Sequence, residues 1–190
     1  MVNNFDLILS VLPEEKDLNV FFHLQVLMRK KDHPTLKGKN NSSRTIRAYM
    51  IHCKADLLNY KEEIITLSEA TKSRVMINLS PKSTKALTWA MSERLSWILQ
   101  NNYMQLVSGI YNYGLGHVKP SNADRLFLID FDTKDQKEID EEISKVNRKV
   151  ELIVPTKNGF HYLVKPFDVR KINADVHKNN PTLLYYPNSL

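Results

Sequence analysis

The sequence predicts an α/β (α+β) protein in which an N-terminal αβ unit packs with a C-terminal half of the RNA-recognition, or ferredoxin-like, type. Apolar runs of strand length alternate with segments of helical periodicity along the chain. Residues 120–190 follow the order strand, helix, strand, strand, helix, strand of the βαββαβ arrangement. The length of 190 residues, with 42% hydrophobic and 25% charged residues, is typical of one folded domain. We therefore expect a single domain over 1–190, built from an N-terminal unit (1–115) and a C-terminal half (120–190).

The N-terminal unit contains three strand-like and two helix-like segments. Aromatic and β-branched residues without Gly predict the strands, and apolar residues at helical spacing predict the first helix. Pro81 is expected to end the third strand, and Ser83 to cap the helix that follows. The predicted elements are a strand at 18–30, a strand at 44–53, a helix at 55–72, a strand at 73–81 and a helix at 83–103. Trp89 and Trp97, eight residues apart on this last helix, are interpreted as core residues.

Two basic segments of this unit are candidates for binding phosphate groups. The lysine-rich residues 30–39 are interpreted either as a solvated loop or as a flexible nucleic-acid clamp. Arg74, Lys82 and Ser83 belong to the strand and the strand-to-helix junction, where free amide groups and the helix dipole favour phosphate. They are interpreted either as a simple helix cap or as residues that hold a triphosphate or a template backbone.

The C-terminal half begins with the apolar run "LFLIDFD", which predicts a strand followed by an acidic helix. Two further apolar runs flank Lys157 and Asn158, so they predict a hairpin whose turn is relaxed by Gly159. The predicted elements are a strand at 125–132, a helix at 132–147, a strand at 149–156, a strand at 159–167, a short helix near 168–175 and a strand at 182–187.

The overall charge of the chain favours polyanionic partners. The formal net charge is +6 and the sequence pI is about 9.3, and a cationic surface attracts ligands that carry phosphate groups. No segment reaches the roughly 18 uncharged apolar residues of a membrane helix, and the N-terminal residues lack the basic region of a signal peptide. The single Cys53 excludes an internal disulfide. We expect a cytoplasmic protein with no membrane partner, in the host cytoplasm if it is encoded by a phage.

Asp130 and Asp132 are the first candidate site residues. Residues i and i+2 of a strand point to the same face, so the two carboxylates project side by side. At an effective dielectric constant of about 20 their repulsion is on the order of 4 kcal/mol, and a divalent cation removes it. Hard oxygen ligands of this kind suit Mg²⁺ or Mn²⁺. The alternative is that Asp132 caps the acidic helix that follows while Asp130 is solvated at the strand end.

His161 is the second candidate. The first and third strands of the ferredoxin-like order pair at the centre of the sheet, so His161 is expected to reach the two carboxylates. Lys165, four residues on, lies on the same strand face. An imidazole near a metal-bound phosphate donates a hydrogen bond, and a lysine supplies a cation. The alternative is a core histidine whose hydrogen bonds are satisfied within the protein.

Three segments resemble, in order and approximate spacing, the three motifs of the archaeo-eukaryotic primase superfamily, which includes primase-polymerases of phages and plasmids. They are "FLIDFD", "TKNGFH" and "ADVHKNNPTLLYYPNSL". Asp130 and Asp132 match the hDhD pair of that family, and residues 159–161 match its small-x-His element. Its third motif, an acidic residue upstream of a terminal segment similar to "YYPNSL", is matched by Asp175, with Asp168 as the alternate.

The resemblance implies a small phage-type or plasmid-type member that acts as a metal-dependent nucleotidyltransferase. It assigns Asp130, Asp132 and Asp175 to hold two Mg²⁺ or Mn²⁺ ions that activate a 3′-hydroxyl and stabilise the leaving pyrophosphate. It assigns His161 and Lys165 to bind the phosphates of the incoming nucleotide. The implied partners are single-stranded DNA or RNA, nucleoside triphosphates, and a helicase or another replication protein.

Two further interpretations stay open. A protein of the same fold can hold single-stranded nucleic acid, or a protein partner, without performing chemistry. Tyr186 favours such a silent member, because the family commonly has a basic residue ahead of the final Pro. A third interpretation uses the acidic pair and His161 for phosphodiester hydrolysis. Incorporation of nucleotides on a single-stranded template separates the three.

Overall fold

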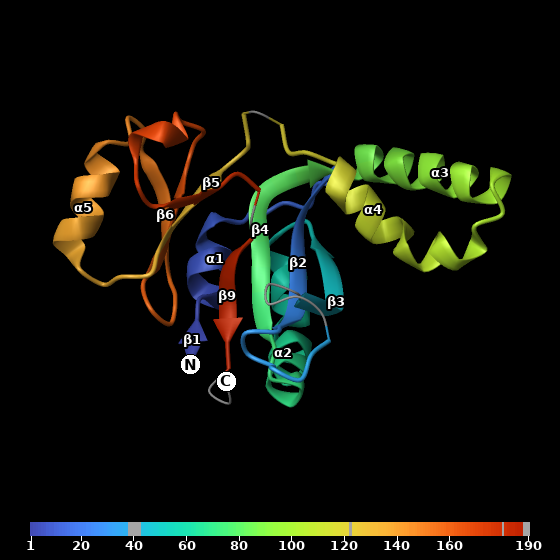
Figure 1. The fold of residues 1–190 in the computed structure, drawn as a ribbon, viewed down its shortest axis with the longest axis horizontal. Helices are drawn as coiled ribbons and strands as arrows, with labels where there is room; N and C mark the ends of the chain where they lie inside the picture. Colours follow the sequence, from blue (N-terminus) through green and yellow to red (C-terminus); the bar gives the residue numbers. More distant parts are fainter. Residues whose placement is uncertain (38–42, 122, 180, 188–190) are drawn as a thin grey trace.

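The computed structural model describes residues 1–37, 43–121, 123–179 and 181–187. Within these residues the chain is an α+β protein with five α-helices and two antiparallel sheets, one of five strands and one of four. Figure 1 shows the smaller sheet beside the larger one in the body of the molecule, with a pair of helices projecting from one side. The α+β class that the sequence predicts is confirmed.

The larger sheet has the strand order β1-β9-β4-β2-β3. Its members are β1 (Val2–Asn3), β9 (Thr182–Tyr186), β4 (Arg74–Ser83), β2 (Val20–Arg29) and β3 (Ser43–Ile51). Strands β2, β3 and β4 correspond to the three predicted strands of the N-terminal unit. β4 continues through Pro81, so the prediction that Pro81 ends this strand is wrong. The pairing of β4 with β2 shifts register at this point, and such a bulge tolerates a residue that has no amide hydrogen.

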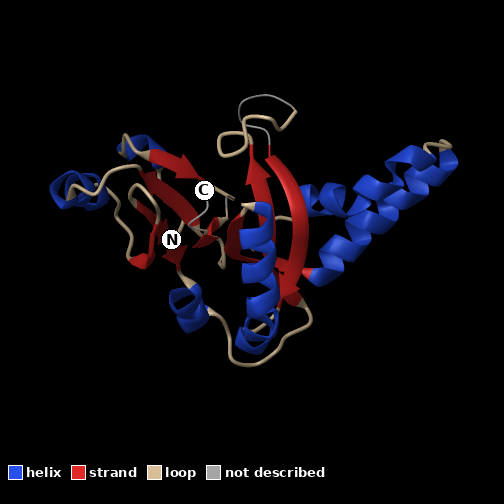
Figure 2. Ribbon diagram, turned by 90° about the horizontal axis from the view of Figure 1, so that it is seen from below, coloured by secondary structure: helices blue, strands red, loops and turns tan. Residues whose placement is uncertain are grey.

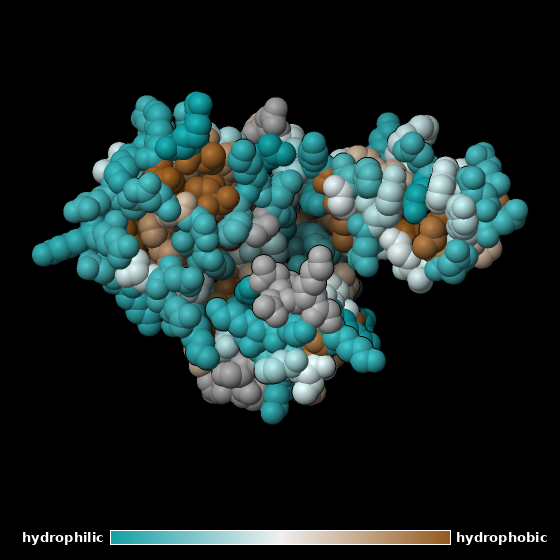
Figure 3. All heavy atoms as spheres, in the orientation of Figure 1, coloured by the Kyte–Doolittle hydropathy of each residue, from teal (hydrophilic) through white to brown (hydrophobic). Residues whose placement is uncertain are grey.

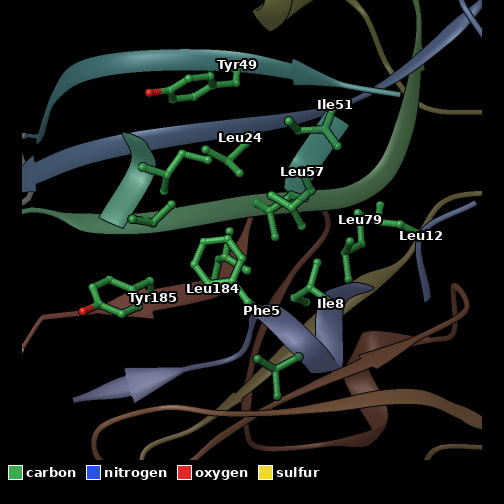
Figure 4. Close-up of a cluster of buried hydrophobic side chains, with 14 of the residues drawn as sticks. Phe5, Ile8, Leu12, Leu24, Tyr49, Ile51, Leu57, Leu79, Leu184 and Tyr185 are labelled. Atoms are coloured by element: carbon green, nitrogen blue, oxygen red, sulfur yellow. The ribbon is translucent and has the colours of Figure 1, made fainter. Parts of the chain in front are cut away.

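Two helices cover one face of the larger sheet. α1 (Phe5–Val11) and α2 (Lys54–Thr71) bury Phe5, Ile8 and Leu57 against strand residues that include Leu24 and Leu184. Figure 4 shows these side chains meeting between the helices and the sheet. Arg74, Met76 and Leu183 of the same sheet line, together with residues of the smaller sheet, the cavity described below.

The smaller sheet has the order β6-β7-β5-β8. Its members are β6 (Val150–Pro155), β7 (Phe160–Val164), β5 (Phe127–Phe131) and β8 (Asp175–His177). α5 (Gln136–Ser144) covers one face, where Ile129, Ile139 and Tyr162 belong to one buried cluster. Leu128 and Leu163 point to the opposite face and join the core around α1. One side of this sheet is therefore shared with the N-terminal unit.

The last strand, β9, departs from the prediction. The sequence analysis places the strand at 182–187 in the sheet of the C-terminal half, but β9 pairs with β4 and β1 of the larger sheet. All five residues of β9 are buried, which suits a strand with a neighbour on each side. The place beside β5 is taken by β8, which the sequence analysis does not predict. The short helix expected near 168–175 is reduced to the 3-10 turn η2 (Val169–Lys171).

An arm of helices projects from the end of β4. It consists of α3 (Thr84–Gln100), the 3-10 helix η1 (Met104–Gly109) and α4 (Ile110–His117), and it is clear of the body in both ribbon views (Figures 1 and 2). Ser83 caps α3 by accepting a hydrogen bond from the Ala86 amide at 3.2 Å, as predicted. Trp89 and Trp97 are 75% and 41% exposed, so their interpretation as core residues is wrong.

None of the helices in the described part of the chain has both the length and the apolar character needed to cross a bilayer.

Candidate functional site

The predicted site residues of the C-terminal half meet on three neighbouring strands. In the antiparallel register, Asp130 of β5 lies opposite His161 of β7 on one side and opposite Asp175 of β8 on the other. Residues directly opposite in antiparallel strands point to the same face, and so does Asp132, two residues after Asp130. These four residues therefore share the face of the smaller sheet that looks toward the larger sheet.

His161 lies between Asp130 and the larger sheet. Its Nε2 atom is 3.5 Å from Oδ1 of Asp130, and its Nδ1 atom is 2.9 Å from the hydroxyl of Thr182 on β9. A neutral imidazole carries one N–H, so if the Thr182 hydroxyl donates to Nδ1, the hydrogen on Nε2 faces the carboxylate. Thr182 thus orients the ring and links the acidic residues to the larger sheet.

Gly159 allows β7 to start close to the end of β5. A Cβ atom at this position would lie 1.9 Å from the carbonyl oxygen of Phe131 and 2.7 Å from that of Thr133. No side chain fits there without moving the backbone. This close approach of Gly159 to β5 fixes the position of β7 along β5, so that His161, two residues later, lies opposite Asp130.

A cavity of about 560 Å³ lies over these residues, between the two sheets. Of the predicted site residues, Asp130, Asp132, His161 and Arg74 line it. The other lining residues are Leu27, Arg29, Lys31, Asp32, Ser43, Met76, Leu128, Thr156, Lys157, Asn158, His177, Pro181, Leu183 and Tyr186. The smaller sheet contributes Asp130, with Asp132 just beyond the end of β5, and the turn between β6 and β7 contributes Lys157. The larger sheet contributes Arg29 and Arg74, and the turn after β2 contributes Lys31 and Asp32.

The basic side of the cavity is built around Tyr186 of β9. The guanidinium carbon of Arg74 is 4.9 Å from the centre of the Tyr186 ring, and the ammonium of Lys157 is 5.0 Å from it. Arg74 also donates two hydrogen bonds of 2.6 Å to Asp32, so its guanidinium is held in place. Two cations thus lie close to one aromatic ring in the lining of the cavity.

Burial shifts the pKa of two residues in this site. Burial raises the pKa of Asp130, as do the neighbouring Asp132 and Asp175, while His177 and Arg29 oppose the shift. Burial, together with the neighbouring His177 and Arg74, lowers the pKa of His161 to about 4, against the effect of Asp132. At neutral pH His161 is therefore an uncharged hydrogen-bond donor.

The aspartates fit a hard divalent cation in part. Within the described residues, no group of three or more His, Cys, Asp and Glu side chains is close enough to hold a metal ion. Asp175 is exposed and does not line the cavity, although its Cα lies about 4.5–5.5 Å from that of Asp130, as in any directly opposed pair. Asp130 and Asp132 supply two carboxylates, and Mg²⁺ or Mn²⁺ commonly completes its coordination with water and phosphate oxygens.

The structure does not bring Arg74, Lys82 and Ser83 together, so the three cannot hold one triphosphate, whereas the alternative of a simple helix cap is confirmed for Ser83. Arg74 begins β4 and Ser83 ends it, and strand geometry separates Arg74 from Lys82 by about 26 Å. The ammonium of Lys82 donates a hydrogen bond of 2.8 Å to the carbonyl of Leu115 on the arm. Lys82 and Ser83 thus lie at the root of the arm, and Arg74 alone belongs to the cavity.

Two other candidates also lie away from the cavity. Lys165 follows β7, and its ammonium donates a hydrogen bond of 2.6 Å to the carbonyl of Ala123. Asp168 accepts two hydrogen bonds of 2.8 Å from the Arg170 guanidinium, which holds its pKa at about 2, and it caps η2. Neither residue lines the cavity. Asp175 does not line it either, but it lies directly opposite Asp130 in the sheet, so of the two alternative third acids the fold places Asp175 nearer to the pair.

The sequence analysis missed several lining residues. His177 could have been found, because it lies two residues after Asp175 and so on the same strand face. Arg29 lies at the end of β2, and Asp32 lies in the turn after it. Their position beside the cavity depends on the pairing of β2 with β4, which no local sequence pattern predicts. Of the lysine-rich segment 30–39, Lys31 lines the cavity; residues 38 and 39 lie outside the described part of the chain, as does the "NSL" of "YYPNSL".

Comparisons with protein-family models, with curated proteins and with solved structures found no match to this chain.

Proposed function

We propose that the chain is a metal-dependent nucleotidyltransferase of the primase-polymerase type, which adds nucleotides from nucleoside triphosphates to single-stranded nucleic acid. The observation that carries the proposal is that Asp130, Asp132 and His161 line one cavity together with the cations Arg29, Lys31, Arg74 and Lys157. A site for a nucleoside triphosphate needs both kinds of side chain. Cations bind its phosphates, and carboxylates bind the metal ion that bridges those phosphates.

The fold of the C-terminal half supports the same proposal. The order β6-β7-β5-β8, with α5 between β5 and β6, is compatible with a ferredoxin-like sheet in which β8 takes the place of the last strand and η2 that of the second helix. Asp175 then starts the strand beside Asp130, which is where the third acidic motif of the resembled family is expected. Tyr186 departs from the basic residue of that family, but Arg74 and Lys157 supply positive charge on both sides of its ring.

In this function, Asp130 and Asp132 hold a Mg²⁺ or Mn²⁺ ion, with Asp175 reaching the same site by a rotation of its side chain. The ion supplies Lewis-acid stabilisation of the phosphoryl oxygens and of the leaving pyrophosphate. Neutral His161 donates a hydrogen bond to a phosphate oxygen, with its ring oriented by Thr182. Arg74 and Lys157 neutralise the remaining phosphate charge.

The deciding experiment is the incorporation of labelled nucleoside triphosphate on a single-stranded template with Mn²⁺. We expect extended products from the native chain and none from Asp130→Asn, with a lane without nucleotides to reveal cleavage. A parallel melting series isolates metal binding: Mn²⁺ should raise the melting temperature of the native chain and not that of Asp130→Asn/Asp132→Asn, because a ligand stabilises only the state that binds it. Equal responses to Mn²⁺ would remove the metal site from the proposal.

A second candidate function is single-strand binding without chemistry. Asp175 is exposed and does not line the cavity, which favours binding without chemistry. Without Asp175, two carboxylates are few to hold the two metal ions of a phosphoryl-transfer site. In that case the native chain binds single strands with an affinity that falls steeply with salt and extends none of them. Cleaved template without added nucleotide would instead select hydrolysis.

A further inference from the structure

The helical arm, residues 84–117, differs in composition from the rest of the chain. Its 34 residues contain three charged side chains, Lys85, Glu93 and Arg94, whereas a quarter of the whole chain is charged. With two cations and one anion its net charge is +1, so the basic character of the protein resides mainly outside the arm. Nucleic acid is held chiefly by Lys and Arg contacts to phosphates, and the arm offers few of these.

Large apolar side chains stay exposed on the arm. Trp89 is 75% exposed, Met104 57%, Leu99 53% and Tyr103 44%. Figure 3 shows hydrophobic side chains among the hydrophilic ones on this part of the surface. Exposed aromatic residues and Met, combined with a depletion of charge, are the composition of protein interfaces. The arm is thus suited to a protein partner.

The exposed face of α3 has a symmetric pattern. Trp89, Glu93 and Trp97 follow each other at intervals of four residues, so they form one stripe along the helix. The stripe lies on a different side of α3 from Leu87, which is buried in a cluster with Phe21 and Val118. Reading it in either direction gives the same order, an indole, a carboxylate and an indole. A two-fold interface requires a surface that complements itself in this way.

We propose that α3 pairs antiparallel with α3 of a second copy of this chain, about a two-fold axis near Glu93. Each Trp89 then packs against Trp97 of the partner subunit. Two carboxylates near the axis repel each other, which weakens the pairing, because Arg94 is held against Trp97 and Tyr113 of its own arm. The arm carries too few charges to complement a strongly acidic or basic partner, whereas a second copy of the arm is equally poor in charge.

Neighbouring side chains hold part of this surface rigid. The guanidinium carbon of Arg94 lies 4.3 Å from the centre of the Trp97 ring and 4.7 Å from that of Tyr113. Tyr103 stacks on Trp97 with ring centres 5.4 Å apart. Trp97 and Arg94 are thus ordered before association, so little rotamer entropy is lost when they bind.

The size of the helix sets the strength of the pairing. A helix of 17 residues is about 26 Å long and 10–12 Å thick, so its open side covers a few hundred Å². This is less than the roughly 800 Å² that each partner contributes to a stable interface of standard size. The dimer is therefore weak and reversible, and it dissociates on dilution.

Sedimentation and fluorescence of the full chain test the pairing together. Trp89 and Trp97 are the two tryptophans of the sequence, so intrinsic fluorescence reports on the stripe directly. As the concentration rises from about 1 µM to about 1 mM, the range of weak association, we expect the sedimenting mass to double and the emission to shift to shorter wavelength. Trp89→Ala should weaken dimerisation at least tenfold, because buried Trp side chains dominate interfaces. Leu58→Ala, at a position 53% exposed on α2, should leave it unchanged.

Oxidative cross-linking tests the position of the axis. Cys53 is 3% exposed, so a thiol introduced by Glu93→Cys is the accessible one. A disulfide forms only when two Cα atoms approach within about 7 Å, so Glu93→Cys should give a cross-linked dimer and Leu58→Cys should not. A native chain that stays monomeric over the whole concentration range overturns the proposal, even if another protein binds the arm. So does equal cross-linking at the two positions.

Discussion

Asp130 lies among the other ionisable side chains of the candidate site. Its carboxylate lies 3.5 Å from His161, shares a face with Asp132, and belongs to a residue directly opposite Asp175. Burial and the two neighbouring aspartates raise its pKa, since each disfavours a further negative charge. Negative charge is thus concentrated around Asp130, and a divalent cation bound there, as we propose, would relieve the repulsion between the carboxylates.

The third acid, Asp175, distinguishes the proposed nucleotidyltransferase from a protein that only binds single strands. Asp175→Ala is expected to reduce nucleotide incorporation at least a hundredfold, because two-metal transfer needs a further carboxylate beside Asp130 and Asp132. Single-strand binding and the melting temperature should change little, since Asp175 is exposed. Asp168→Ala is the matched control, and it should stay active because Asp168 pairs with Arg170 instead. Full activity of Asp175→Ala would refute the three-acid arrangement.

His23 gives the protein a sensitivity to acid that is separate from the site. Burial, together with the neighbouring Lys82, lowers the pKa of His23 to about 4, and the ring lies near Tyr111 at the root of the arm. Between pH 6.5 and 4 the unfolded chain binds a proton that the folded chain does not, so stability falls as the pH falls. We expect a loss on the order of 2–3 kcal/mol from this residue by pH 4.

Urea denaturation across this pH range checks the expectation. His23→Gln removes the titrating group, so its free energy of unfolding should fall less steeply between pH 6.5 and 4 than that of the native chain. The comparison uses slopes, so a uniform loss of packing in the variant does not affect it. Parallel slopes for the two proteins would show that His23 is not the source.

At the scale of the elements, the sequence predicts which segments form helices and strands better than it predicts which strands pair with each other. The strands β2, β3 and β7 are predicted because aromatic and β-branched residues set their local preference. β8 has three residues in a polar stretch and forms only because β5 offers a free edge, which no local pattern records. The same holds for the site. The spacing of Asp130 and Asp132 is a local feature, whereas the place of Arg29 and Asp32 depends on how the two sheets pack.

The turn between β6 and β7 is an element whose geometry the site requires. Gly159→Ala should lower the free energy of unfolding by about 3 kcal/mol or more, because a Cβ 1.9 Å from the Phe131 carbonyl forces the backbone apart. His161 should lose its place beside Asp130 in the same variant, with loss of the Mn²⁺ response. Gly116→Ala is the control, since nothing lies within 4 Å of its Cβ position, and it should leave stability unchanged or slightly raised. Similar melting temperatures for both variants would contradict this view of the turn.

At the scale of the molecule, the N-terminal unit and the C-terminal half are joined by a strand. The segments 1–115 and 120–190 were expected to form two packed units of one domain, yet β9 lies inside the sheet of the first. Thr182 at its start orients His161, and Tyr186 at its end lies between two cations of the cavity. β9 thus belongs to the larger sheet and also lines the cavity of the candidate site.

Division of the chain between the two units tests this arrangement. A fragment of residues 1–119 lacks β9, so β4 loses a partner and β1 is left unpaired within the described sheet. We expect this fragment to show no cooperative thermal transition on its own and to regain one when residues 120–190 are supplied as a second fragment. A cooperative transition of 1–119 alone would show that β9 is dispensable to the larger sheet. Circular dichroism of the fragments, separate and mixed, is the measurement.

The pairing of β1 with β9 also determines how the protein reaches its native state. Val2 lies opposite Tyr186, so two segments from almost opposite ends of the chain must meet before the larger sheet is complete. The entropy of closing so long a loop opposes this step, whereas the β2–β3 hairpin closes a short one. Chains dominated by such distant contacts fold slowly, in milliseconds to seconds. The hairpin is thus an early event of folding, and the cavity, whose walls include both ends of β9, takes its shape among the last.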